Sequence, residues 1–93
     1  MAKVSYPEAL REASRPHRLV VLAMLADLEA GSPGALFPLS NIARPDIPVR
    51  SMRTALRSLY KTGLITAREG GYGLTYDGRT ILGVLMHQLG SLE

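Results

Sequence analysis

"PVRSMRTALRSLYKTGLITAREGGYGLTYDG", residues 48–78, carries most of the signals that decide the fold of this chain. Its first part predicts a helix over residues 48–62. Pro48 suits the first helical position because its missing N–H would have no partner there, and Gly63 suits the left-handed conformation that ends a helix. At about 1.5 Å per residue, this helix would be roughly 22 Å long.

The rest of this stretch predicts a β-hairpin followed by a last helix. Residues 64–68 and 72–75 have the pattern of short strands, with Glu69-Gly70-Gly71 as the turn region between them. Thr75 can then cap a helix over about 76–89, and Asp77 in its first turn would interact favourably with the helix dipole. The hairpin and this helix form the C-terminal half of the expected fold.

The N-terminal half predicts three more helices and a very short strand. Residues 7–13 form a short first helix; Ser14 is a candidate cap for a second, mostly apolar helix, and Gly31 a candidate for its left-handed end. Residues 35–37 predict a very short strand, and a two-turn helix begins at Pro38. We therefore expect an α+β, mainly α fold: helices, a short strand, two helices, a hairpin and a C-terminal helix.

Composition predicts a single domain over residues 1–93. The chain has no cysteine, which rules out disulfides and thiolate metal sites. The apolar run at residues 19–26 is much shorter than the roughly 20 residues that a membrane span needs, and the N-terminus lacks the order of a signal peptide. We therefore expect a soluble, cytoplasmic protein with no membrane contact.

The positive charge is concentrated in one segment. Residues 1–46 hold five basic and five acidic side chains, whereas residues 69–93 hold one basic and three acidic side chains. The segment between them, residues 47–68, holds five basic side chains and no acidic one. Such a block repels itself unless it meets an anionic partner.

On the helix at residues 48–62, apolar and basic residues alternate in sequence but separate in space. At about 100° per residue, one sector collects Met52, Ala55, Leu56 and Leu59. The almost opposite sector collects Arg50, Arg53, Thr54, Arg57 and Lys61. Exposed helix faces commonly mix charges of both signs, so this face is either an unusual solvated surface or a surface for binding nucleic acid.

The order of these elements, and the residues that carry it, resemble the winged helix-turn-helix family. More narrowly, the chain looks like the small archaeal and bacterial transcription regulators of the MarR and PadR kind. The matching stretch runs from Leu39 to Leu82, with the helix-turn-helix at about 38–62 and the hairpin "wing" at about 64–75. Its motifs are Ile42-Ala43, Leu56 with Leu59, Gly63-Leu64-Ile65, and Leu74-Thr75-Tyr76-Asp77-Gly78.

The resemblance implies sequence-specific binding of double-stranded DNA, with the helix at residues 48–62 in the major groove. The residues expected to meet base edges or phosphates are Arg50, Ser51, Arg53, Thr54, Arg57 and Lys61. Arg68 and Tyr72 on the wing are candidates for the minor groove or the backbone, although Tyr72 is equally well explained as an aromatic residue that covers the hairpin.

The last helix is apolar around most of its circumference, and an exposed apolar patch usually marks an interface. Regulators of this family are commonly homodimers, and two-fold dimers are the commonest assembly. The expected dimer interface consists of Ile81, Leu82, Leu85, Met86 and Leu89. The alternative is that the N-terminal helix folds over this surface.

Other functions have weaker support in the sequence. His17 and His87 are far apart and have no ligand partners at metal-binding spacing, no nucleophilic triad can be recognised, and "GGYG" lacks the Lys and Ser/Thr of a phosphate-binding loop. We therefore expect no enzyme activity, no cofactor and no metal, and no effector can be named. The main alternative function is a winged-helix protein–protein module of a larger transcription or remodelling complex, without DNA contact. RNA binding would require an aromatic stacking platform that the sequence lacks.

Overall fold

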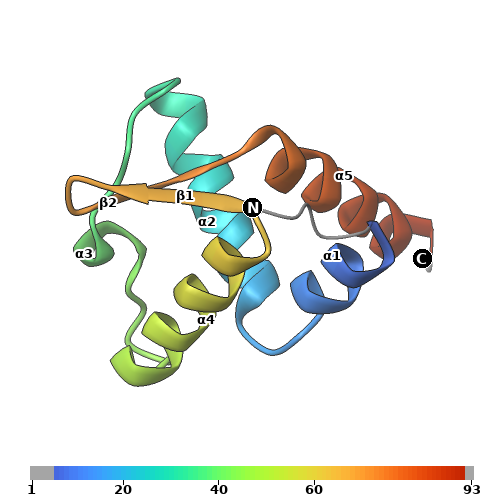
Figure 1. Cartoon of the computed structure of the whole chain (residues 1–93), viewed down its shortest axis with the longest axis horizontal. Helices are drawn as coiled ribbons and strands as arrows, with labels where there is room; N and C mark the ends of the chain where they lie inside the picture. The colour runs from blue at the N-terminus through green and yellow to red at the C-terminus, as the bar shows by residue number, and fades with distance from the viewer. Residues whose placement is uncertain (1–5, 92–93) are drawn as a thin grey trace.

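The computed structural model describes the backbone of residues 6–91 and the side chains of residues 7–88. The fold is α+β and mainly helical, and its element order is that of a winged helix, as predicted (Figure 1). The elements are α1 (Tyr6–Ala13), α2 (Arg18–Gly31), α3 (Leu39–Ile42), α4 (Val49–Lys61), β1 (Ile65–Arg68), β2 (Gly71–Leu74) and α5 (Tyr76–Ser91).

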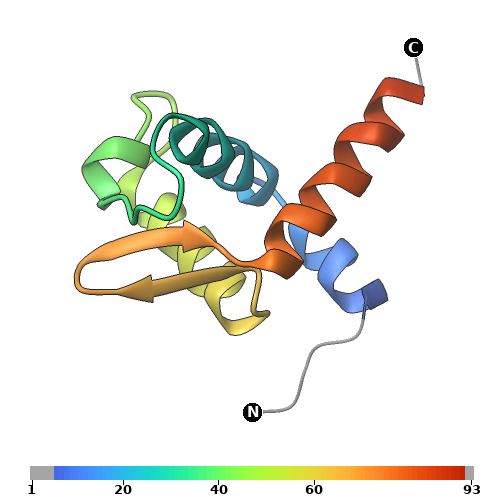
Figure 2. The same cartoon turned by 90° about the horizontal axis from the view of Figure 1, so that it is seen from above.

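Helix α2 lies in the middle of the fold and contacts α4, α5 and β2. Its buried residues Val21, Leu22 and Leu25 join one apolar core with side chains from every other helix and from both strands. Figure 2 shows the hairpin on one side of the molecule and the pair α1 and α5 on the other. The core therefore holds the hairpin, α3 and α4 together as one end of the fold.

The hairpin is closed by a two-residue turn. Antiparallel pairing runs from Ile65 opposite Leu74 to Arg68 opposite Gly71. The two turn residues, Glu69 and Gly70, have φ values of 53° and 76°. Positive φ at both central positions is the requirement of the hairpin turn whose twist matches that of the strands. This turn limits the wing to two four-residue strands.

The strand expected at residues 35–37 is reduced to a single bridge. Phe37 and Tyr72 exchange two backbone hydrogen bonds, each of 2.8 Å, on the edge of β2 that β1 leaves free. The next residue is Pro38, which has no N–H to donate to a further rung of the ladder. The expected strand is therefore wrong in extent, although the predicted segment does pair with the hairpin.

Thr75 joins the end of α4 to the start of α5. Its hydroxyl donates a 2.7 Å hydrogen bond to the carbonyl of Gly63 and accepts a 3.0 Å hydrogen bond from the N–H of Gly78, so it caps α5 as predicted. Its own N–H donates to the carbonyl of Leu64 at 3.2 Å. Gly63 is left-handed, with φ of 78°, and a Cβ on Gly78 would collide with the Leu64 carbonyl oxygen. We call these four residues the α4–α5 junction.

The start and end of α2 differ from the sequence prediction. Ser14 does not cap α2, because its hydroxyl donates a 2.7 Å hydrogen bond back to the carbonyl of Leu10 in α1. The chain then turns through His17, which is left-handed with φ of 70°, and α2 begins at Arg18. Gly31 is the last helical residue rather than a left-handed one.

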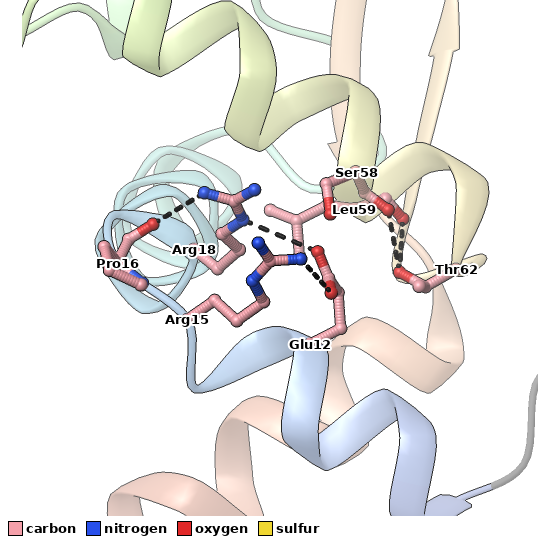
Figure 3. Close-up of polar contacts among 7 residues, drawn as sticks. All are labelled: Glu12, Arg15, Pro16, Arg18, Ser58, Leu59 and Thr62. Carbon is pink, nitrogen blue, oxygen red and sulfur yellow. Dashed lines mark hydrogen bonds and ion pairs between the residues drawn. The ribbon is translucent and has the colours of Figure 1, made fainter.

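A buried ion pair accounts for the position of Arg18. This side chain is only 8% exposed, and its guanidinium donates a 2.8 Å hydrogen bond to the carbonyl of Pro16. Its Nε lies 3.6 Å from Oε1 of Glu12 in α1, and Arg15 approaches the other carboxylate oxygen at 3.3 Å (Figure 3). Neither Nε of Arg18 nor Oε1 of Glu12 has a hydrogen-bond partner among the described residues. The pair thus links α1 to α2 by charge more than by hydrogen bonding.

The junction predicts an asymmetric response at Thr75. Replacing it with Val removes the cap and leaves the Gly63 carbonyl without its hydroxyl partner, which should lower the free energy of unfolding by about 2 kcal/mol. Thr75→Ser keeps the hydroxyl and should cost less than half as much. Urea unfolding followed by circular dichroism measures both. Equal losses in the two variants would show that the hydroxyl contributes nothing.

The buried pair predicts non-additive losses of stability. Glu12→Leu leaves the Arg18 guanidinium buried without its carboxylate and should cost about 3–5 kcal/mol. The double variant Glu12→Leu/Arg18→Met removes both charges and should be more stable than Glu12→Leu alone. The same unfolding measurement applied to both single variants and the double variant completes the cycle. Additive losses would mean that the two charges do not interact.

Candidate nucleic-acid interface

Helix α4 separates its apolar and basic side chains onto two faces, as the sequence predicts. Its buried side chains, which are Met52, Ala55, Leu56 and Leu59, face the core. Its cations are all exposed, and they are Arg50, Arg53, Arg57 and Lys61. The core contact of the apolar face therefore fixes the direction in which the basic face points.

Within the described residues, no ion pair neutralises the basic face. The ion pairs between described residues are Arg15–Glu12, Arg18–Glu12, Arg44–Asp46 and Arg79–Glu29. Each joins a carboxylate to an arginine outside α4 and the hairpin. Within the described residues, the four cations of α4 and Arg68 of the hairpin have no ion-pair partner. These five charges therefore remain available to an external anion.

The acid nearest to the start of α4 is paired locally. Asp46 accepts hydrogen bonds of 3.0 and 3.4 Å from Arg44, two residues before it. These bonds hold the pKa of Asp46 below its usual value and raise that of Arg44. Asp46 therefore remains ionised until the pH falls through that lowered pKa, and only then is the pair lost. Above it, the arginine offsets the negative charge beside the helix N-terminus.

Two hydroxyl residues of the predicted interface are less available than the cations. Thr54 is exposed, but its hydroxyl donates a 3.0 Å hydrogen bond to the carbonyl of Arg50 in its own helix. It therefore presents its methyl group and a hydroxyl oxygen that can accept. Ser51 is only half-exposed, on the flank of α4 next to the apolar face. The arginines are the most accessible part of the predicted set.

Two exposed apolar side chains also belong to this surface, and the sequence analysis did not include them. Val49 is 53% exposed and Tyr60 is 50% exposed. At about 100° per residue they lie on one margin of the exposed sector, Thr54 lies on the other, and Arg53 and Arg57 lie between them. Their helical spacing from Arg53 could have indicated in the sequence that Val49 and Tyr60 lie on the same side of the helix as this cation. The exposed sector thus spans about 140° and includes apolar groups at its edge.

The two wing residues of the predicted interface lie on opposite faces of the hairpin. Side chains alternate along a strand and directly opposite residues share a face, so the register puts Tyr72 with Ala67 and Arg68 with Gly71. Tyr72 is half-buried and packs against the core, whereas Arg68 is exposed beside the turn. Tyr72 therefore covers the inner side of the hairpin, which was the alternative explanation, and Arg68 is the wing residue free to contact a partner.

The described side chains of α5 do not form the broad apolar surface on which the expected dimer interface rested. Ile81, Leu82 and Leu85 are buried inside the single chain, and α1 packs against α5. Met86 is 53% exposed, and the side chain of Leu89 lies outside the described residues. An interface through the three buried residues is therefore corrected to a core contact, because α1 and α2 already cover them.

An apolar groove of about 480 Å³ lies between the C-terminal part of α2 and residues 79–86 of α5. Apolar atoms form most of its lining, which includes Ala26, Pro33, Leu74, Leu82 and Met86. The ion pair between Arg79 and Glu29, 2.8 Å long, also borders it. This groove is the second surface of the described chain with the character of a binding site.

Comparisons with protein-family models, with curated proteins and with solved structures found no match to this chain. Metal binding and membrane insertion were also considered for the described residues. No group of three or more His, Cys, Asp or Glu side chains is arranged to hold a metal ion. No helix in the described part of the chain is long and apolar enough to cross a membrane.

Proposed function

We propose that this protein binds double-stranded DNA with sequence specificity and acts as a transcription regulator of the winged helix-turn-helix kind. The observation that carries the proposal is the exposed face of α4, whose four cations have no ion-pair partner among the described residues. An unpaired cationic face on a helix anchored by its opposite side is suited to a phosphate-lined groove. The wing arginine adds a fifth charge of the same sign.

In this proposal the cations of α4 have two roles. Arg50 and Arg53 lie in its first turns, where a recognition helix meets base edges, and a guanidinium matches the two acceptors of guanine. Lys61 is the last residue of α4, and its ammonium suits a phosphate. Arg57 lies between them, and Arg68 reaches the backbone from the wing. Base edges thus supply specificity and phosphates supply position.

A homodimer stays a prediction, as does membership of the family that the sequence resembles. With three of the expected interface residues in the core, Met86 and the groove between α2 and α5 are the described apolar surface of α5 that a two-fold contact could still use. Two copies would neutralise about eight phosphates and one copy about four. The number of copies on the DNA is therefore measurable through the salt dependence of binding.

The alternative function is a protein–protein module without DNA contact, and the apolar groove is the observation that favours it. Such a module would bind its partner through the groove and would have no use for the charges of α4. Removing these charges therefore distinguishes the two functions. If the unmodified protein binds duplex DNA and the variant does not, the DNA proposal is supported. If the unmodified protein binds no duplex, and the variant still binds its protein partner, the module is supported.

The first prediction concerns salt. The affinity for duplex DNA should fall steeply as salt rises, because bound phosphates release their counterions. The log–log slope should be about −7 for two copies and about −3.6 for one. Fluorescence anisotropy with a labelled duplex between low and physiological salt measures it. A slope near zero, or no binding at low salt, would contradict the proposal.

The second prediction compares two cations on the same helix. Arg53→Ala should cost about 1–3 kcal/mol on the preferred site and relax its base preference. Lys61→Ala should weaken all sequences about equally and make the salt slope shallower by about one unit per contact. Binding to a panel of single-base variants of the site separates the two effects. The reverse result would mean that α4 enters the groove in another orientation.

A further inference from the structure

The exposed face of α4 has an apolar margin beside its cations, and Val49 forms the N-terminal end of that margin. Val49 is the first residue of the helix and is 53% exposed. Val49 belongs neither to the buried core nor to the partly buried residues packed against it, whereas Ile47 and Met52 are both buried. Val49 thus makes little contribution to the core, and its methyl groups remain in solvent at the end of a basic surface.

Valine is a poor choice for an exposed first turn on grounds of helix formation alone. Its branched side chain lowers helix propensity, and its methyl groups make no hydrogen bond to the free N–H groups at the helix start. The preceding residue, Pro48, has no polar side chain either, and no side-chain cap is present. Exposed methyl groups at this position do suit a partner that presents an apolar group of its own.

Duplex DNA offers one apolar group in the major groove, which is the C5-methyl group of thymine. Arg53 lies four residues after Val49, so the two side chains leave adjacent turns of α4 about 5–6 Å apart at Cβ. Successive base pairs are spaced by about 3.4 Å. A guanine contacted by Arg53 and a thymine contacted by Val49 would therefore be one or two base pairs apart.

We propose that Val49 is a specificity-determining residue that contacts a thymine methyl group one or two base pairs from the guanine read by Arg53. The inference rests on the proposed function, because it assumes that α4 enters the major groove. It adds the chemical class of the site: a thymine close to a guanine, recognised by its methyl group. Val49 then recognises the thymine through an apolar contact, and Arg53 recognises the nearby guanine through charge-assisted hydrogen bonds.

The test removes one methyl group at a time from the DNA. A preferred duplex is first selected from random DNA with the unmodified protein, and each thymine is then replaced by deoxyuridine, which lacks only the C5-methyl group. One thymine within two base pairs of a guanine should lose about three- to fivefold in affinity, as expected for a single buried methyl group. The other thymines should tolerate the change.

Two variants show whether Val49 is the residue that recognises the thymine methyl group. Val49→Ala should bind the thymine duplex more weakly and should no longer distinguish it from the deoxyuridine duplex. Tyr60→Ala is the matched control, because Tyr60 is an equally exposed residue on the same margin three turns along. It should retain the full effect of deoxyuridine at that position. Circular dichroism and unfolding curves verify that both variants are folded.

The outcomes separate this inference from the proposed function. Salt-dependent duplex binding that tolerates deoxyuridine at every position overturns the role of Val49 alone, as does a deoxyuridine effect that persists in Val49→Ala. A selected site with no thymine within two base pairs of a guanine also overturns it. Absence of duplex binding at low salt overturns the proposed function itself, and with it this inference.

Discussion

The hydrogen bonds of Thr75 hold the rest of the arrangement together. The end of α4, the start of β1 and the start of α5 meet within the α4–α5 junction, where one hydroxyl accepts from Gly78 and donates to Gly63. Gly78 has no side chain, and this lets α5 start directly against the Leu64 carbonyl. Because β1 leaves the junction toward the wing tip, the same contacts set the direction of the hairpin relative to α4 (Figure 1).

Within the described residues, the placement of the ion pairs explains why the cations of α4 have no carboxylate partner. Glu12 holds α1 to the start of α2 through the buried Arg18, and Glu29 holds α2 to α5 through Arg79. Asp46 pairs with Arg44 in the turn before α4. These three carboxylates are thus used where helices meet or turn. The cations of α4 are exposed and pair with no carboxylate of the described residues, so their mutual repulsion is relieved only by an external anionic partner.

The parts of the fold that the sequence predicted well are those set by local chemistry. Pro48 and Gly63 bound α4 within one residue of its observed ends, because a missing N–H and a left-handed φ have the same consequence in any surroundings. The two faces of α4 follow from helical periodicity in the same way. Thr75 was predicted as a cap, although its bond to Gly63 is tertiary and has no signal in the local sequence.

The predictions that failed depended on contacts between distant segments. Ser14 is a residue type that often caps helices, but α2 begins four residues later, at Arg18. Arg18 is also the residue that pairs with Glu12 of α1, a contact that the local sequence does not reveal. The apolar residues of α5 were interpreted as an interface because the α5 sequence alone does not show that α1 and α2 pack against them. Val49 was missed for a different reason. The sequence analysis considered charged and hydroxyl side chains as contacts on this helix, and the exposure of Val49 became evident in the folded structure.

The two surfaces with binding character lie on different parts of the fold and do not compete. The groove lies between the C-terminal part of α2 and residues 79–86 of α5, and no residue of α4 lines it. A partner in the groove would contact Leu74, Leu82 and Met86 while the basic face of α4 stayed open. Leu74 ends the wing strand, and Arg79 at the groove's border follows the α4–α5 junction by one residue. The groove therefore borders the same junction that joins the wing to α4.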